Sequence, residues 1–334
     1  MLTSSIINHS CPAVLLLVFN RPDKIRCVLE RVRDAHPCAL YIACDGPREG
    51  SEHDLQAIAE VRKIVESIDW APEIFTLFRD ANLGCGRAVS EGISWFFNYE
   101  EEGIILEDDC LPSPSFFTFC SQMLLRYRDN NKVACICGVN IDPTSTLTKD
   151  DYYFSRSFAC WGWATWKRAW RMYHYDFRHY SQILSYSGAR HHYCSLTEWL
   201  ADCGNYYDLQ RGYVNTWDWQ WWVTCRLAGK VCCFPRVNLV RNIGFGKQST
   251  HTRNPLDPMR NLDLGTMPAV LRHPDSISVN HKAEIRICYK TNKITMPRVL
   301  AYWLLRLTHT FNLVRSIYLF LVRLFAKFVL KGHE

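Results

Sequence analysis

Apolar residues in the first part of the chain follow two alternating spacings. Short continuous apolar runs predict buried strands at residues 13–19, 39–44, 73–78, 103–106 and 133–139. Between them, apolar positions recur every three or four residues, which predicts helices at 21–32, 55–68, 86–97 and 116–127. Strands that alternate with helices through short connections are typical of a mainly parallel sheet covered on both faces. The pattern therefore predicts an α/β fold.

Polar residues gather where the predicted strands end. The clusters are Asn20-Arg21, Asp45-Gly46, Asn82-Leu83-Gly84 and Glu107-Asp108-Asp109. Open parallel sheets bind their ligands beyond the carboxyl ends of the strands, so these clusters indicate a nucleotide site on one rim. The sequence contains neither GxGxxG nor GxxxxGK[ST], which argues against a dinucleotide-binding fold and a P-loop.

The three adjacent carboxylates Glu107, Asp108 and Asp109 are the first candidate for site chemistry. Carboxylates beside a hydrophobic core repel one another unless a positive group lies among them. Mg²⁺ or Mn²⁺ is suited to that position, because these cations take carboxylate, water and phosphate oxygens. An acidic turn that caps the next helix is the alternative, and local spacing leaves the two interpretations open.

Beyond residue 140 the chain is rich in aromatic residues, with tryptophan clusters at 161–166 and 217–222. Aromatic rings can stack on sugars, but most of these tryptophans are expected in the core, where large aromatics are common. Asp218 lies inside the second cluster, where burial would suit it to act as a general base. The alternative is an N-cap for a helix at 219–227.

A polar loop with two glycines follows at residues 242–252 and contains Lys247, Ser249 and His251. Glycines permit close approach of the backbone, and Lys247 and His251 could meet a diphosphate. An ordinary surface loop is the alternative interpretation.

From Arg298 to Lys331 the chain has six Lys or Arg residues and no acidic residue, and its apolar positions recur every three or four residues. Its uncharged runs are shorter than the roughly 20 residues that a membrane span requires. The tail is predicted to be a basic amphipathic helix on an anionic membrane surface. A helix packed on its own domain or on a second subunit is the competing interpretation.

Composition narrows the setting. The chain of 334 residues is 48% hydrophobic and can bury a sizeable core. Its sixteen cysteines form no CxxC pair, and no secretory signal pattern precedes the first strand, which predicts a reducing compartment, the cytoplasm. Buried thiols are predicted for the cysteines inside apolar runs, namely Cys44, Cys135, Cys137, Cys225, Cys232 and Cys233. The net charge of +6 is matched by the six basic residues of the tail, so nucleic-acid binding is not indicated.

Taken together, these segments resemble GT-A fold (Rossmann-like) glycosyltransferases. The resemblance is to bacterial family-2-like sugar transferases and, more distantly, to N-acetylglucosaminyltransferase I. It runs from residue 13 to 251 and is carried by Phe19-Asn20-Arg21-Pro22, Asp45-Gly46-Pro47-Arg48, Asn82-Leu83-Gly84 with Arg87, Glu107-Asp108-Asp109, Trp161-Gly162-Trp163, Trp217-Asp218 and the loop at 244–251. The membrane anchor that precedes the Golgi enzyme has no counterpart here, and the region beyond Thr252 has no match.

The resemblance implies a role for each matching position. Asp109 would hold Mn²⁺ or Mg²⁺, and Glu107 and Asp108 would touch the sugar or ribose. Arg21, Asp45 and Arg87 would lie near the nucleotide base and ribose. Asp218 would be the general base, and the loop that carries Lys247, Ser249 and His251 would close over the diphosphate.

The expected protein has a nucleotide-sugar-binding half (1–140), an acceptor-binding half (141–275) and a C-terminal segment (276–334). It would be an inverting transferase that moves a sugar from a nucleotide-diphosphate sugar, foremost a UDP-sugar, to a glycan or lipid-linked glycan at the cytoplasmic face of the membrane. A sugar nucleotidyltransferase is one alternative. A catalytically silent, membrane-associated carbohydrate-binding protein is another.

Overall fold

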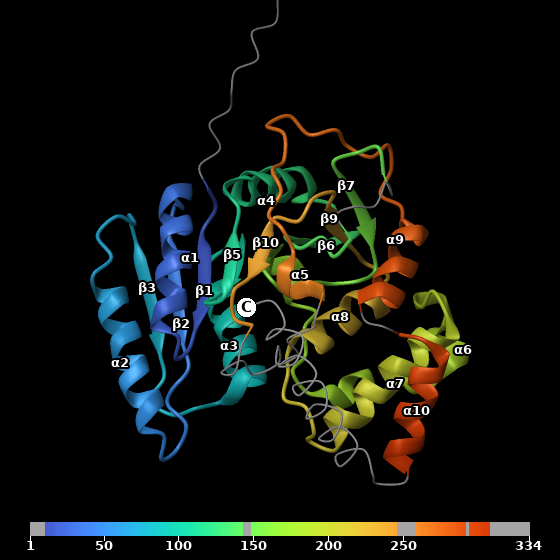
Figure 1. Ribbon diagram of the computed structural model, residues 1–334. Coiled ribbons are helices and arrows are strands. Elements are labelled where there is room, and N and C mark those ends of the chain that lie inside the picture. The colour runs from blue at the N-terminus through green and yellow to red at the C-terminus, as the bar shows by residue number, and fades with distance from the viewer. Residues whose placement is uncertain (1–10, 143–147, 246–257, 292–293, 308–334) are drawn as a thin grey trace, which may run out of the picture.

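A central eight-stranded sheet organises the computed structural model, which describes residues 11–142, 148–245, 258–291 and 294–307 (Figure 1). The strand order is β3-β2-β1-β4-β8-β6-β9-β7, and β8 and β7 run opposite to the other strands. The strands are β1 (Val14–Val18), β2 (Leu40–Cys44), β3 (Ile74–Phe78), β4 (Glu102–Glu107), β6 (Val133–Cys137), β7 (Tyr152–Ser155), β8 (Trp163–Trp166) and β9 (Val231–Pro235). A small antiparallel sheet pairs β5 (Cys110–Pro112) with β10 (Val240–Asn242).

Helices cover both faces of the central sheet. Buried residues of α1 (Pro22–Ala35), α2 (Glu52–Glu66) and α4 (Pro114–Tyr127) share one core with the sheet. Those of α3 (Gly84–Tyr99), α5 (Lys167–Trp170) and α8 (Asp218–Leu227) share the other. The predicted α/β class, a mainly parallel sheet with helices on both faces, is therefore confirmed.

The remaining helices belong to the chain after residue 140. They are η1 (Phe177–Leu184), α6 (Tyr186–Ala189), η2 (Arg190–His192), α7 (Leu196–Gln210), η3 (Pro258–Asn261), α9 (His281–Arg286), the π-helix η4 (Ile287–Thr291) and α10 (Met296–Leu307). Of these, α6, α7, α9 and α10 lie on the right in Figure 1. Both β6, which precedes residue 140, and the later strands β7, β8 and β9 belong to the central sheet. The division at 140 therefore stays a prediction.

Burial explains why the apolar pattern identified the strands. The central strands β1 and β2 are buried along their whole length, so they need apolar side chains on both faces. In α1, Pro22 occupies the first turn, and Ile25, Val28 and Leu29 form a buried stripe. All sixteen cysteines are free thiols, and the six that the apolar pattern placed in the core are buried: Cys44, Cys135, Cys137, Cys225, Cys232 and Cys233.

Most tryptophans of the two clusters at 161–166 and 217–222 are buried, as expected. Trp163 and Trp166 belong to β8, a strand inserted antiparallel between β4 and β6, and both are buried. The Trp163 ring stacks on Trp217, with centroids 5.6 Å apart, so the two tryptophan clusters meet on the α8 side of the sheet. That contact brings the start of α8 to the sheet.

The described part of the tail packs on the protein itself. The Tyr302 hydroxyl of α10 donates a hydrogen bond to the Gly204 carbonyl in α7 (2.8 Å), and Arg306 is buried against Asp208 at 2.6 Å. For residues 296–307 these contacts agree with the alternative of a helix packed on its own domain. Residues 308–334 lie outside the described residues. None of the described helices combines the length and apolar character needed to cross a bilayer.

Candidate functional site

The acidic cluster and Arg21 meet because their strands are neighbours. β1 and β4 pair in parallel, with Leu17 opposite Glu107, so the residues after both strands lie on the same rim. The Arg21 guanidinium, at the start of α1, lies 2.6 Å from Asp109 Oδ2 and 3.3 Å from Asp108 Oδ1. The Phe19 backbone N–H donates to Asp108 Oδ2 at 3.1 Å. The structure thus joins two of the predicted polar clusters.

One arginine does not balance this much negative charge. Burial, reinforced by Asp109, Asp108 and Asp218, holds the pKa of Glu107 well above its ordinary value, and Arg21 only partly offsets it. Burial and the neighbouring Asp109 raise the pKa of Asp108 to about 7, against the opposing pull of Arg21. A second positive charge would stabilise the ionised form of this cluster.

Asp109 also anchors the loop that follows β10. The side-chain amide of Asn242 donates to Asp109 Oδ1 at 3.3 Å, and the Ile243 N–H donates to the Asp109 carbonyl at 2.8 Å. A Cβ at position 244 would collide with the Asp109 carboxylate, so this close approach requires Gly244. Three predicted residues of this loop, Lys247, Ser249 and His251, lie outside the described residues.

Asp218 is the first residue of α8, and the N-cap position is Trp217. Its Oδ1 accepts hydrogen bonds from the Trp219 N–H at 2.9 Å and from the Thr216 hydroxyl. Its Oδ2 lies 3.9 Å from the Cys160 thiol. The carboxylate is thus fixed at the helix start by one oxygen, while the other is directed toward Cys160.

A cavity of about 530 Å³ joins Asp218 to the acidic cluster. Arg21, Glu107 and Asp109 line it together with Asp218, and aromatic side chains complete its wall: Phe158, Trp161, Trp217, Trp219 and Trp222. A cavity of this size can hold a monosaccharide with room for part of a second ligand. The acidic cluster and Asp218, which are more than one hundred residues apart in sequence, therefore face the same cavity.

A second cavity of about 270 Å³ adjoins the first, and Arg21, Cys85 and Glu107 line both. The second cavity extends along the ends of β1 and β2 and is lined by Asp45, Asn82 and two arginines, Arg48 and Arg79. All four predicted polar clusters border this cavity, and two of them border both cavities, through Arg21 and Glu107.

Asp45 is used to build the rim. Its carboxylate accepts hydrogen bonds from the backbone N–H groups of Gly46 (2.9 Å), Leu83 (3.0 Å) and Gly84 (3.0 Å), and from the Asn82 side chain (2.9 Å). Because Gly84 begins α3, the carboxylate also lies at the positive end of that helix. Asp45 therefore borders the second cavity as a residue that fixes the turn at 82–84.

Arg87 is the predicted residue that lies apart. Its side chain is 58% exposed, pairs with Glu91 at 3.3 Å and lies over the Tyr175 ring. Among the described residues, those that border the two cavities do not include Arg87.

The sequence did not reveal several residues that shape the site. Buried Asp54 binds Arg48 through two hydrogen bonds of 2.5 and 2.8 Å and also accepts from Asn20 at 2.7 Å, and these donors hold its pKa far below the ordinary range. The Asn215 side chain accepts from the Gly86 N–H at 2.9 Å, across 129 positions. The pair of Arg48 and Asp54 had a weak local signal, because the acidic residue follows six positions after the arginine. The pair of Gly86 and Asn215 had no signal in the sequence.

No family model and no curated protein matches the sequence. Solved structures that match include the mannosyltransferase PcManGT from Pyrobaculum calidifontis, in complex with GDP-Man and Mn²⁺ (13% identity, TM-score 0.32, 50% of this chain and 48% of that one). Others are S. aureus TarS 1-349 (10%, 0.35, 50% and 51%) and the inositol-1-phosphate CTP transferase from T. maritima (11%, 0.31, 49% and 74%). At these TM-scores, the function has to be argued from the site.

Proposed function

We propose that this protein is an inverting glycosyltransferase that uses a nucleotide-diphosphate sugar and a divalent cation. The observation that carries the proposal is the cavity of about 530 Å³, which Glu107, Asp109 and Asp218 line together. Transfer of a sugar to a hydroxyl group requires charge stabilisation at the leaving diphosphate and a proton acceptor beside the nucleophile. This cavity has carboxylates suited to both tasks.

The donor set fits Mn²⁺ or Mg²⁺. Glu107 and Asp109 offer hard carboxylate oxygens, and the raised pKa of Glu107 reflects its burial and then the neighbouring negative charge that Arg21 only partly offsets. In this proposal Asp109 holds the cation, with Glu107 and Asp108 near the sugar or ribose. A bound divalent cation would supply Lewis-acid stabilisation of the diphosphate leaving group.

The second cavity suits the nucleoside. It adjoins the acidic cluster and is bordered by Arg48, Arg79 and the turn that Asp45 fixes. Arg21 borders both cavities, so its guanidinium is placed to contact a diphosphate that extends from one into the other. Lys247, Ser249 and His251 remain predicted contributors from the loop after Gly244.

Asp218 is the proposed general base. The Trp219 N–H and the Thr216 hydroxyl fix Oδ1, and Oδ2, whose contact is the Cys160 thiol at 3.9 Å, would accept the proton of an acceptor hydroxyl. Attack on the anomeric carbon from the side opposite the diphosphate inverts its configuration. The aromatic wall of the cavity would pack against the acceptor sugar. A lipid-linked acceptor and a position at the cytoplasmic membrane surface remain predictions from the tail.

Isothermal titration with UDP and GDP, with and without Mn²⁺, tests the proposal. We expect nucleotide binding that depends on Mn²⁺ and is weakened at least tenfold by Asp109→Ala, because one charged ligand contact is worth about 1.4 kcal/mol or more. Asp34→Ala, at an exposed position of α1, is the matched control and should bind as the wild type does.

Metal-independent nucleotide binding, or an Asp109→Ala protein that binds like the wild type, would contradict the proposed cation site. No nucleotide binding at all would favour the catalytically silent carbohydrate-binding alternative. Release of pyrophosphate from a nucleoside triphosphate and a sugar phosphate would identify a nucleotidyltransferase instead.

A further inference from the structure

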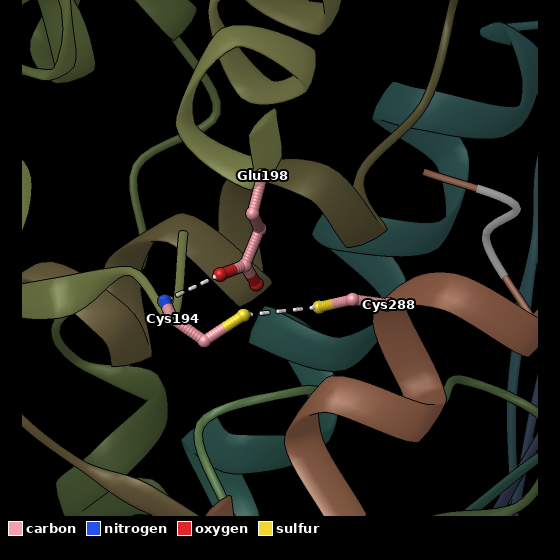
Figure 2. A group of neighbouring side chains, drawn as sticks. All are labelled: Cys194, Glu198 and Cys288. Atoms are coloured by element: carbon pink, nitrogen blue, oxygen red, sulfur yellow. Dashed lines mark hydrogen bonds between the residues drawn. The ribbon is translucent and has the colours of Figure 1, made fainter. Parts of the chain in front are cut away.

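A second group of metal-ligand side chains lies where three segments meet, outside the two cavities. Cys194 precedes α7, Glu198 belongs to its first turn, and Cys288 lies in the π-helix η4, as Figure 2 shows. A sulfur or oxygen atom from each lies within 4.8 Å of those of the other two, and no other described residues form such a group. Cys288 and Glu198 are buried, and Cys194 is partly exposed.

The spacing of the two sulfurs fits a tetrahedral zinc ion. Cys194 Sγ and Cys288 Sγ are 3.6 Å apart. Zn–S bonds of about 2.3 Å place two sulfurs of a tetrahedron roughly 3.8 Å apart, whereas a disulfide bond is about 2.05 Å long. The Cys194 backbone N–H donates to Glu198 Oε2 at 2.8 Å, which holds the carboxylate on the side of the thiols.

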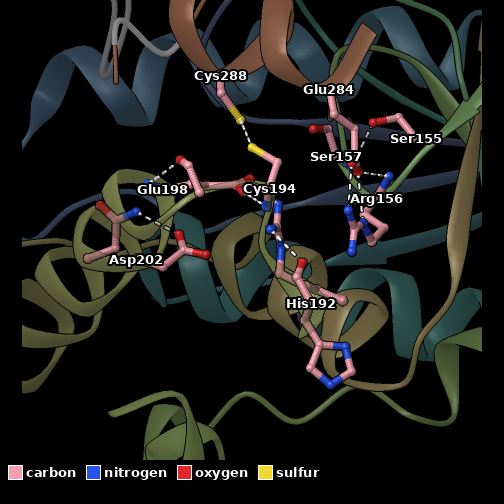
Figure 3. A network of polar contacts seen from close by, with 12 residues as sticks. Ser155, Arg156, Ser157, His192, Cys194, Glu198, Asp202, Glu284 and Cys288 are labelled. Carbon is pink, nitrogen blue, oxygen red and sulfur yellow. Dashed lines mark hydrogen bonds and ion pairs between the residues drawn. The ribbon is translucent and has the colours of Figure 1, made fainter. Parts of the chain in front are cut away.

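Charge balance supports the same ligand. Arg226 donates to Glu198 Oε1 at 2.6 Å and to the His192 carbonyl at 2.9 Å, so its guanidinium is fixed beside the group. Figure 3 shows Glu198 and His192 with the two cysteines. Both side chains of this ion pair are buried. If Zn²⁺ replaces the two thiol protons, two S–H bonds break, two Zn–S bonds form and two protons leave to solvent. The net charge of the buried group is then unchanged.

We propose that Cys194, Glu198 and Cys288 bind Zn²⁺, with water as the fourth ligand on the side where Cys194 is exposed. The ion would have a structural role, because it joins η4 to the start of α7. That helix supplies Asn205 and Leu209 to the cavity that contains Asp218. This proposal does not depend on the proposed transferase activity.

Titration of the reduced full-length chain with Co²⁺, which replaces Zn²⁺ and is coloured, tests the site. We expect thiolate-to-cobalt charge-transfer absorption and intense visible bands of tetrahedral cobalt, saturating at one equivalent and abolished by added Zn²⁺. Cys194→Ser and Cys288→Ser should each remove the charge-transfer absorption. Cys27→Ser and Cys38→Ser, at exposed cysteines, are matched controls that should keep it.

The same titration separates this site from the carboxylate site. Cobalt bound at Asp109 has no thiolate ligand, so Asp109→Ala should keep the charge-transfer absorption even if the proposed function is wrong. Zn²⁺ should also raise the Tm of the wild type but not that of Cys194→Ser, whose partly exposed position makes retention of the fold the expectation; circular dichroism checks this. Absorption that survives in both serine variants, or its absence in the wild type, would overturn the zinc site. So would a Cys194–Cys288 disulfide found by mass spectrometry after purification without reductant.

Discussion

Two groups of carboxylates on one rim of the sheet differ in how their charge is satisfied. Asp45 follows β2, and its oxygens accept four hydrogen bonds from the turn around 82–84 and from Gly46. Glu107 ends β4, and Asp108 and Asp109 follow it on the same rim, where the nearby cation is Arg21. The sequence presents both groups in the same way, as acidic residues just after an apolar strand.

Position at a strand end does not separate a carboxylate that the protein satisfies with donors from one that it leaves with few. The number of donors does. Four donors satisfy Asp45 within the protein, whereas burial and, after it, repulsion between neighbouring carboxylates raise the pKa values of Glu107 and Asp108. Unbalanced charge in the second group is what a bound cation would neutralise.

Asp108→Asn should change how the free energy of unfolding depends on pH. The pKa of Asp108 is raised to about 7 from an ordinary 3.8, so the folded protein keeps a proton that the unfolded chain loses between these pH values. The contribution of Asp108 to the free energy of unfolding should therefore be complete below pH 3.8 and fall as the pH rises. It should level off above about pH 7, for a loss of about 4 kcal/mol at most. Urea unfolding of the metal-free protein at pH 5 and pH 8 measures the fall.

The amide that replaces the carboxyl group in Asp108→Asn does not ionise, so this variant should show a much smaller fall than the wild type. Asp34→Asn, at an exposed position, is the control and should follow the wild type. An equal fall in Asp108→Asn and the wild type would mean that other groups set the pH dependence.

Asp45→Ala should affect stability at every pH. Removing the carboxylate leaves the Leu83 and Gly84 N–H groups without an acceptor, and hydrogen bonds to a charged group are each worth about 1.5–3 kcal/mol. We expect the free energy of unfolding to fall by about 3 kcal/mol, measured by urea unfolding. Asp45→Asn keeps an acceptor oxygen and should lose less. A loss below about 1 kcal/mol would show that Asp45 is not the residue that fixes the turn.

Local pattern was enough for much of the fold because the central strands are buried on both faces and the helices on one. The strands before residue 110 and α1 to α4 follow from those two periods. The pattern failed at β8, whose tryptophans give no strand period, and at α7, where the buried residues include Asp202 and Asp208 rather than an apolar stripe. In both places, tertiary contacts decide the structure.

The site was predictable only where its residues follow a strand in sequence. The acidic cluster and Arg21 belong to that class. Contacts between distant segments were not predictable from spacing: the two sulfurs of Cys194 and Cys288 meet across 94 positions, and Asn242 reaches Asp109 across 133. Arg87 is near the rim in sequence but is exposed and does not border either cavity, so its role near the nucleotide stays a prediction.

Asp218 shares one feature with Asp45 and another with Asp109, so its role can be either structural or catalytic. Like Asp45, it accepts a backbone N–H at a helix start, from Trp219 at 2.9 Å. Like Asp109, it borders the large cavity. If the bonds to Oδ1 are its whole role, its replacement should change stability; if it is the general base, replacement should change turnover.

Asp218→Asn separates these outcomes, because the amide oxygen can still accept the Trp219 N–H but the side chain cannot take a proton. We expect kcat to fall by about 10²-fold or more, with Mn²⁺-dependent nucleotide binding and Tm close to those of the wild type. Donor hydrolysis and transfer to glycan acceptors, followed with the same nucleotide sugar, measure kcat. Thr216→Val, which removes the second donor to Oδ1 but keeps the carboxylate, is the control and should lower kcat much less. Unchanged turnover with a lowered Tm in Asp218→Asn would place Asp218 with Asp45, as a carboxylate that only holds its helix.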